Sequence, residues 1–80
     1  MDNAKYGALI KAVRNSRGVK AVFIARKIGV SISTYTEIEA GRRNITLERA
    51  DEIAAVMGMT LPELLRHEVS ESLTITGTES

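Results

Sequence analysis

Basic and acidic side chains are divided between the two halves of this 80-residue chain. Residues 1–43 carry nine lysines and arginines against three acidic residues, a net charge of +6, whereas residues 44–80 carry two against seven, a net charge of −5. A cluster of cations attracts nucleic-acid phosphates, because binding releases the counterions condensed around them. The same division is also typical of ordinary solvated helix faces, so the charges alone leave both interpretations open.

Side chains suited to catalysis are scarce. His67 is the only histidine, it lies near the end of a predicted helix, and neither a cysteine nor a carboxylate cluster with metal-ligand spacing accompanies it. We therefore expect a binding protein and not an enzyme, with no cofactor, no metal and no small-molecule substrate. The lack of cysteine is typical of a reducing compartment, and no apolar run approaches the roughly 18 residues of a membrane span. These features predict a cytoplasmic protein without a membrane partner.

Two short helical patterns are separated by Gly29-Val30-Ser31. Gly29 can end the first helix because it has no Cβ and tolerates the left-handed conformation. The Ser31 hydroxyl can then cap the second helix. Two helices joined this tightly predict a helix-turn-helix, whose second helix can enter the major groove of DNA. Because the turn lies in the basic half, it favours the phosphate-binding interpretation and predicts a sequence-specific DNA-binding regulator.

Apolar periodicity predicts five helices and no strand within residues 1–67. The first helix ends at Gly18, and its apolar positions are Tyr6, Leu9, Ile10 and Val13. The fourth has Thr46 as N-cap and ends at Gly58. It is predicted to direct five side chains inward: Leu47, Ala50, Ile53, Ala54 and Met57. The fifth begins at Thr60, with Glu63 closing a capping box.

The composition changes after residue 67, where serine and threonine alternate with other residues. We therefore divide the chain into a domain over residues 1–67 and a polar tail over residues 68–80. The tail is either flexible and solvated, or it forms a short strand over residues 72–76 that pairs with a partner chain. The second alternative depends on the good β-propensity of Thr74-Ile75-Thr76.

Three segments, in order and at characteristic spacing, resemble the Cro/C1-type helix-turn-helix family, also called the XRE family, over residues 6–65. They are Leu-Ile-Lys-Ala-Val-Arg followed by Arg-Gly (9–18), Ile-Ala-Arg-Lys-Ile-Gly-Val-Ser (24–31) and Ile-Glu-Ala-Gly-Arg-Arg-Asn (38–44). The resemblance implies an all-α fold, a compact five-helix lambda-repressor-like domain with the helix-turn-helix at its second and third helices. It also implies a phage or bacterial transcription regulator that binds double-stranded DNA, and we expect a repressor.

By this resemblance the recognition helix runs from Ser31 to Glu39. Ile32, Ser33 and Glu37 hold its main base-reading positions, and Thr36 lies close to them. A serine hydroxyl can bond either kind of base edge, a carboxylate can accept from a cytosine amino group, and an isoleucine can contact a thymine methyl.

A carboxylate that faces the phosphates is electrostatically costly. Glu37 therefore either reads cytosine, which is the interpretation we favour, or turns away to pair with Arg42 or Arg43. The loop after the recognition helix and the basic residues around it resemble the phosphate contacts of the family: Arg17, Lys20, Arg42, Arg43 and Asn44. Such contacts set the orientation of the protein on DNA without reading sequence.

The resemblance also implies an internal ion pair between Arg14 and Glu39, which ties the first helix to the end of the recognition helix. The second helix departs from the family pattern. Lys20-Ala21 replace a capping residue and a glutamine that contacts phosphate, and Val22 and Phe23 replace residues that are usually polar. Phe23 either packs locally or anchors another protein, because large exposed apolar groups often mark interfaces.

A homodimer is expected, because one recognition helix covers about half a turn of duplex and half-sites on a near-palindrome lie roughly 34 Å apart. In the family the dimer contact usually comes from the last helix and the residues after it, which here points to Met59, Leu61, Leu65 and Val69. Alternatively, Leu61 and Leu65 close the core of the monomer.

A second function class keeps the same fold but binds a protein. In this interpretation the exposed Val22–Phe23 patch would contact a toxin, an RNA polymerase subunit or an anti-repressor, and DNA binding would be weak or non-specific. The two classes differ in the role of the basic loop, since a DNA-binding protein needs Arg42 and Arg43 for affinity to every duplex.

Overall fold

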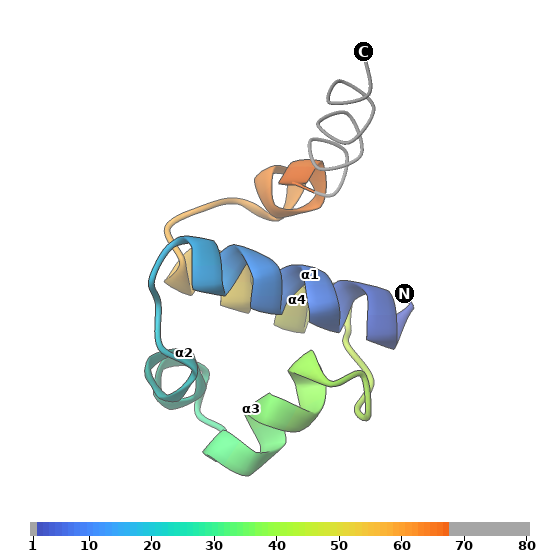
Figure 1. Cartoon of the computed structure of the whole chain (residues 1–80), viewed down its shortest axis with the longest axis vertical. Helices are drawn as coiled ribbons and strands as arrows, with labels where there is room; N and C mark the ends of the chain where they lie inside the picture. Colours follow the sequence, from blue (N-terminus) through green and yellow to red (C-terminus); the bar gives the residue numbers. More distant parts are fainter. Residues whose placement is uncertain (1, 68–80) are drawn as a thin grey trace.

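Side-chain caps mark the start of several helices in residues 2–67, the part of the chain that the computed structural model describes. The order is α1 (Asn3–Ser16), α2 (Ala21–Ile28), α3 (Ile32–Glu39) and α4 (Leu47–Val56), and then a fifth helix over residues 61–67 (Figure 1). Asp2, Ser31 and Thr46 each accept a hydrogen bond from a backbone N–H in the first turn of the next helix. The expected all-α class and five helices are confirmed, and the predicted contributions of Val69 and the tail lie outside the described residues.

Two further boundaries were predicted from the sequence. Gly29 adopts the left-handed conformation with φ of 78° and turns the chain from α2 into α3. Thr60 and Glu63 form the predicted capping box of the fifth helix, since the Thr60 N–H donates to Glu63 Oε1 at 2.9 Å and the Glu63 N–H donates to Thr60 Oγ1 at 3.3 Å. The predictions for Gly29 and for this capping box are confirmed.

One apolar core joins the helices. Every helix contributes to it. Its largest fully buried side chains are Ile10 and Val13 of α1, Ile24 of α2, Tyr35 of α3, Ile53 of α4 and Leu64 of the fifth helix. The predicted inward position of Leu47 is wrong, because 62% of this side chain is exposed. Leu47 is the first residue of α4, and the inward stripe of the helix begins only one turn later, at Ala50.

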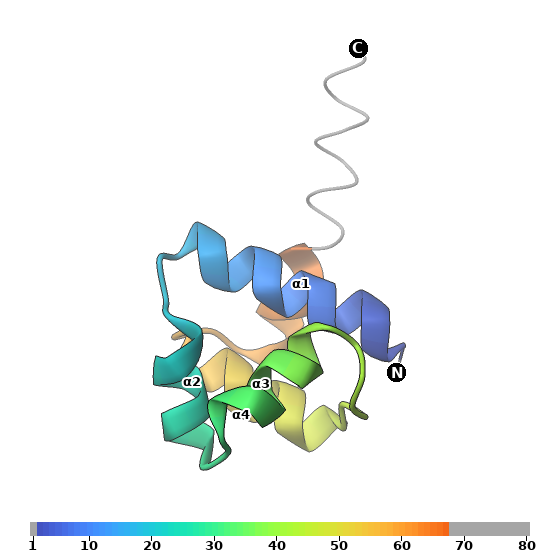
Figure 2. The same cartoon turned by 60° about the horizontal axis from the view of Figure 1, so that its bottom comes forward.

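Other described helices pack on one side of α2 and α3, and the other side of this helix pair is not covered by them. α3 packs against α1 and α2, and α4 packs against α2 (Figure 2). The fifth helix lies on the opposite side of α1 from α3 (Figure 1). None of the helices described in residues 2–67 is long and apolar enough to cross a membrane.

Candidate nucleic-acid interface

The four predicted base-reading residues lie on one face of α3. Ile32, Ser33 and Thr36 are exposed and Glu37 is partly exposed, whereas Tyr35 and Ile38 on the opposite face belong to the core. The helix starts where expected because the Ser31 hydroxyl accepts from the Thr34 N–H at 3.1 Å. The structure therefore brings hydroxyl, methyl and carboxylate groups together on an exposed surface, and these are the group types that contact base edges.

The loop after α3 presents two exposed arginines. Gly41, with φ of 79°, reverses the chain, and the Arg42 N–H donates to the Glu37 carbonyl oxygen at 2.9 Å. This closure is a left-handed C-terminal cap that satisfies the last carbonyl groups of the helix. It places Arg42 and Arg43 directly beside the C-terminal end of α3.

Asn3 fixes the far end of this loop, and its role was missed by reasoning from the sequence. Its Oδ1 accepts from the Ile45 N–H at 2.9 Å, and its Nδ2 donates to Asn44 Oδ1 at 3.0 Å. Asn44, predicted to bind phosphate, is exposed and held by this contact. A short sequence window could not predict these hydrogen bonds, because more than 40 residues separate Asn3 from its partners.

Glu37 and Arg43 form an ion pair on this surface. Arg43 Nε lies 2.7 Å from Glu37 Oε1, and the side chains of Arg43 and Glu37 are 54% and 40% exposed respectively. Two orientations were expected for the Glu37 side chain, one reading cytosine and one paired with a loop arginine. The structure shows the second, in which the carboxylate pairs with Arg43.

Arg14 and Glu39 form a second, buried pair that supports α3 from behind. Arg14 Nε and Nη2 donate to the two Glu39 carboxylate oxygens at 2.7 and 3.1 Å, and Arg14 Nη1 donates to the Val19 carbonyl oxygen at 3.0 Å. The hydrogen bond to Glu39 raises the pKa of Arg14 although burial opposes the charge. Burial, and then the Glu39 carboxylate, raise the pKa of the neighbouring Tyr35 hydroxyl. The pair ties α1 to the last turn of the predicted recognition helix.

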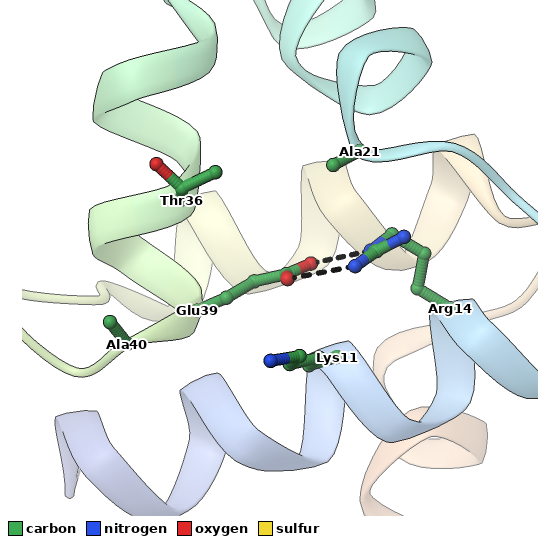
Figure 3. Close-up of a pocket in the computed structure, with 6 residues that line it drawn as sticks. All are labelled: Lys11, Arg14, Ala21, Thr36, Glu39 and Ala40. Atoms are coloured by element: carbon green, nitrogen blue, oxygen red, sulfur yellow. Dashed lines mark hydrogen bonds and ion pairs between the residues drawn. The ribbon is translucent and has the colours of Figure 1, made fainter.

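A recess of about 220 Å³ opens where α1, α2 and α3 meet. It is lined by Lys11, Arg14, Ala21, Thr36, Glu39 and Ala40 (Figure 3). Ala21 lies on one wall, at the position where the family pattern has a glutamine. The Lys20 side chain forms no capping hydrogen bond to α2. The recess therefore borders a helix start whose N–H groups receive no side-chain cap.

Arg17, one of the predicted phosphate-binding residues, contacts the end of α4. Its Nη1 donates to the Met57 carbonyl oxygen at 3.3 Å, at the C-terminal end of α4, which it stabilises as a cation near exposed carbonyl groups. Lys20 is exposed at the start of α2. The structure thus brings Arg42, Arg43 and Asn44 together in one loop and gives Arg17 a partner elsewhere.

The residues expected at a dimer contact differ in their burial. Met59 is only 6% exposed and belongs to the core, so it offers almost no surface to a second chain. Leu61 and Leu65 are partly buried against the core. This burial agrees with the alternative prediction, in which they help to close the core of the monomer. Val69 is outside the described residues.

Val22 and Phe23 form an exposed apolar patch on α2. Their exposed fractions are 44% and 46%, and Lys27 Nζ lies 5.5 Å from the centroid of the Phe23 ring. The patch lines a shallow groove with Gly18, Val19, Lys20 and Arg26. Phe23 therefore keeps nearly half of its surface free of local packing.

Comparisons with known proteins agree with this geometry. Two crystal structures of the clp gene regulator ClgR from Corynebacterium glutamicum are similar, both with a TM-score of 0.78. One is 21% identical and covers 89% of this chain and 92% of that chain, and the other is 22% identical and covers 99% and 83%. No curated protein sequence matches this chain. The family model described as Helix-turn-helix matches residues 10–64. This chain belongs to the Cro/C1-type helix-turn-helix family of DNA-binding transcription regulators.

Proposed function

We propose that this protein is a repressor that binds a specific, near-palindromic operator as a homodimer, with α3 in the major groove of each half-site. The observation that supports this proposal is the continuity of one surface. Four side chains able to contact bases lie on the exposed face of α3, and the two arginines of the adjoining loop lie at its end. Sequence-specific binding requires both kinds of contact, since phosphate contacts orient the protein and base contacts specify the sequence.

Each side chain on the exposed face of α3 has a role that its chemistry allows. Ser33 donates to or accepts from a base edge, and Ile32 packs on a thymine methyl group. Glu37 accepts from a cytosine amino group. Thr36 contributes less, because its hydroxyl already donates to the Ser33 carbonyl oxygen at 2.9 Å.

The DNA backbone is held from both ends of the helix-turn-helix. Arg42, Arg43 and Asn44 contact phosphates on the side of the loop. Lys20 and the N–H groups at the start of α2 contact them on the other side, because an uncapped helix start favours anions. This arrangement compensates for the glutamine that Ala21 replaces.

The homodimer is supported by geometry. α3 has eight residues and reaches about half a turn of duplex, so two copies are needed to specify a full operator. Leu61 and Leu65 retain some exposed surface on the fifth helix, and they are the described residues that we place at the contact. The similar ClgR structures belong to a gene regulator, which supports a regulatory role here.

Salt dependence of binding tests the phosphate contacts. Affinity for any duplex is expected to fall with salt, and Arg42→Ala is expected to reduce the slope of log K against log salt by about 0.9. Arg49→Ala is the matched control, because it removes the same charge from α4, which contributes no residue to the proposed DNA interface or dimer contact. Equal slopes for the two variants would contradict the proposed interface.

A second candidate function is supported by the Val22–Phe23 patch. Its exposure and its shallow groove suit the docking of another protein, as in a helix-turn-helix module that acts through a toxin, an anti-repressor or RNA polymerase. Val22→Ser with Phe23→Ser separates the two functions. DNA affinity is expected to persist in this variant if the first proposal holds, and a protein-binding module would lose its partner.

A further inference from the structure

The ion pair between Glu37 and Arg43 joins two residues whose proposed roles are separate. Glu37 lies on the base-reading face of α3, and Arg43 belongs to the phosphate-binding loop. The 2.7 Å contact joins Glu37 Oε1 to Arg43 Nε. A carboxylate can accept several hydrogen bonds and a guanidinium has five N–H donors, so the pair still has capacity for DNA groups.

Charge gives the pairing a consequence for DNA binding. A single carboxylate carried into the major groove approaches two rows of phosphates and is repelled by them. A carboxylate that is accompanied by a guanidinium at 2.7 Å enters the groove as a neutral unit. The two positions expected for Glu37, paired with a loop arginine or reading cytosine, are therefore compatible with each other.

We propose that Glu37 and Arg43 read DNA as one unit, in which Arg43 is a positioning residue that holds and neutralises the Glu37 carboxylate while this carboxylate accepts from a cytosine amino group. The inference rests on the proposed function and adds to it the part that Arg43 plays in the specificity of this position. Arg43 then contributes to sequence specificity and not only to general affinity, and in this it differs from its neighbour Arg42.

Because the pair is exposed, its effect on DNA binding can be measured separately from its effect on folding. Both side chains are more than one third exposed, and exposed ion pairs contribute little to folding stability. Variants at both positions are therefore expected to keep the thermal unfolding midpoint of the parent chain, measured by circular dichroism. Changes in DNA binding can then be assigned to the interface.

The first experiment selects bound sequences from a random duplex pool with the full chain and with the Glu37→Gln variant. The parent chain is expected to enrich cytosine at one position of each half-site. Glu37→Gln is expected to change the preference at that position to adenine, since an amide pairs with adenine, and to leave the other positions unchanged.

The second experiment is a double-mutant cycle on the selected duplex. Arg43→Ala is expected to weaken binding by at least tenfold and to relax the same cytosine position, because an uncompensated carboxylate then faces the groove. Adding Glu37→Gln to Arg43→Ala is expected to recover part of this loss, because the amide carries no charge that needs compensation, even though it no longer prefers cytosine. The matched control is Arg42→Ala, which is expected to weaken all sequences alike and to gain nothing from Glu37→Gln.

The alternatives give different results. If Arg43→Ala behaves like Arg42→Ala, with uniform weakening, an unchanged cytosine position and no recovery by Glu37→Gln, Arg43 is only a phosphate contact and the inference is overturned. If Glu37→Gln alters no position of an enriched sequence, the inference is overturned while the proposed function survives. If the parent chain enriches no sequence, the proposed function fails and the inference fails with it.

Discussion

Arg14 and Glu39 form a bidentate ion pair that joins α1 to the last turn of α3, with side chains only 12% and 6% exposed. Removal of one partner leaves a buried charge without compensation, which costs about 3–5 kcal/mol. We therefore expect Arg14→Met to lower the free energy of unfolding by that amount in urea denaturation.

The control for this prediction is the double variant Arg14→Met with Glu39→Met, which removes both charges. It is expected to recover a large part of the loss, since apolar residues of similar volume often replace a buried pair without penalty. A loss below about 1 kcal/mol for the single variant would place the pair among ordinary surface ion pairs and contradict its supporting role.

Gly7 allows α1 to approach the backbone of α3. A Cβ at this position would lie 2.5 Å from the Ile38 carbonyl oxygen and 2.6 Å from that of Glu39. Gly7→Ala is therefore expected to destabilise the fold by about 1–3 kcal/mol through overpacking, although alanine is the better helix former. The loss of stability can be measured by thermal unfolding of the parent chain and the Gly7→Ala variant. Ala8→Gly, at an exposed neighbour, should cost about 1 kcal/mol through helix propensity alone, and a stabilised Gly7→Ala variant would disprove the close approach.

Asn3 should matter for DNA affinity although it lies outside the helix-turn-helix. Asn3→Ala removes the hydrogen bonds to Ile45 and Asn44 and frees the loop that carries the arginines, so we expect a several-fold loss of affinity for duplex DNA in fluorescence anisotropy. Asp2→Ala is the matched control, because it removes only the cap of α1, at a cost of about 1 kcal/mol of stability. Equal affinities of the two variants would show that loop order does not limit binding.

The capping box of the fifth helix predicts a pH dependence. Hydrogen bonds from the Thr60 N–H and hydroxyl lower the pKa of the Glu63 carboxyl in the folded protein. A carboxyl whose pKa is lower when folded stabilises the fold above its unfolded pKa, and this contribution is lost as the pH falls through the folded pKa. The stability difference between the parent chain and Glu63→Gln should therefore be present at neutral pH and shrink below pH about 4. A difference that does not change with pH in urea denaturation would contradict this assignment.

Local signals predicted the helices well, and contacts between distant residues were harder to predict. Ser31, Thr46 and Thr60 cap helices through bonds that span three residues, and a short sequence window contains that information. Periodicity predicted the core of α4 but misplaced Leu47, because a stripe of apolar residues does not show where the neighbouring helices stop covering it.

The same difference between local and distant signals applies to the candidate site. The family resemblance, which short sequence segments carry, implied the candidate residues on α3 and in its loop. It did not imply the contacts of Arg17 and Asn3, because Arg17 bonds to Met57 across 40 positions and Asn3 to Asn44 across 41. Gly7 carries no signal in the sequence, since a glycine within a helical pattern does not show which backbone approaches it. These three contacts depend on how the helices pack, and packing is decided by the whole chain.

Selection of bound sequences from a random duplex pool at two salt concentrations would show whether the exposed face of α3 reads a specific sequence of double-stranded DNA. We predict an enriched near-palindrome with half-sites about one helical turn apart, whose enrichment persists at the higher salt while non-specific binding falls. Binding without enrichment that disappears at the higher salt would contradict sequence-specific recognition by α3, because only the basic surface would then be acting.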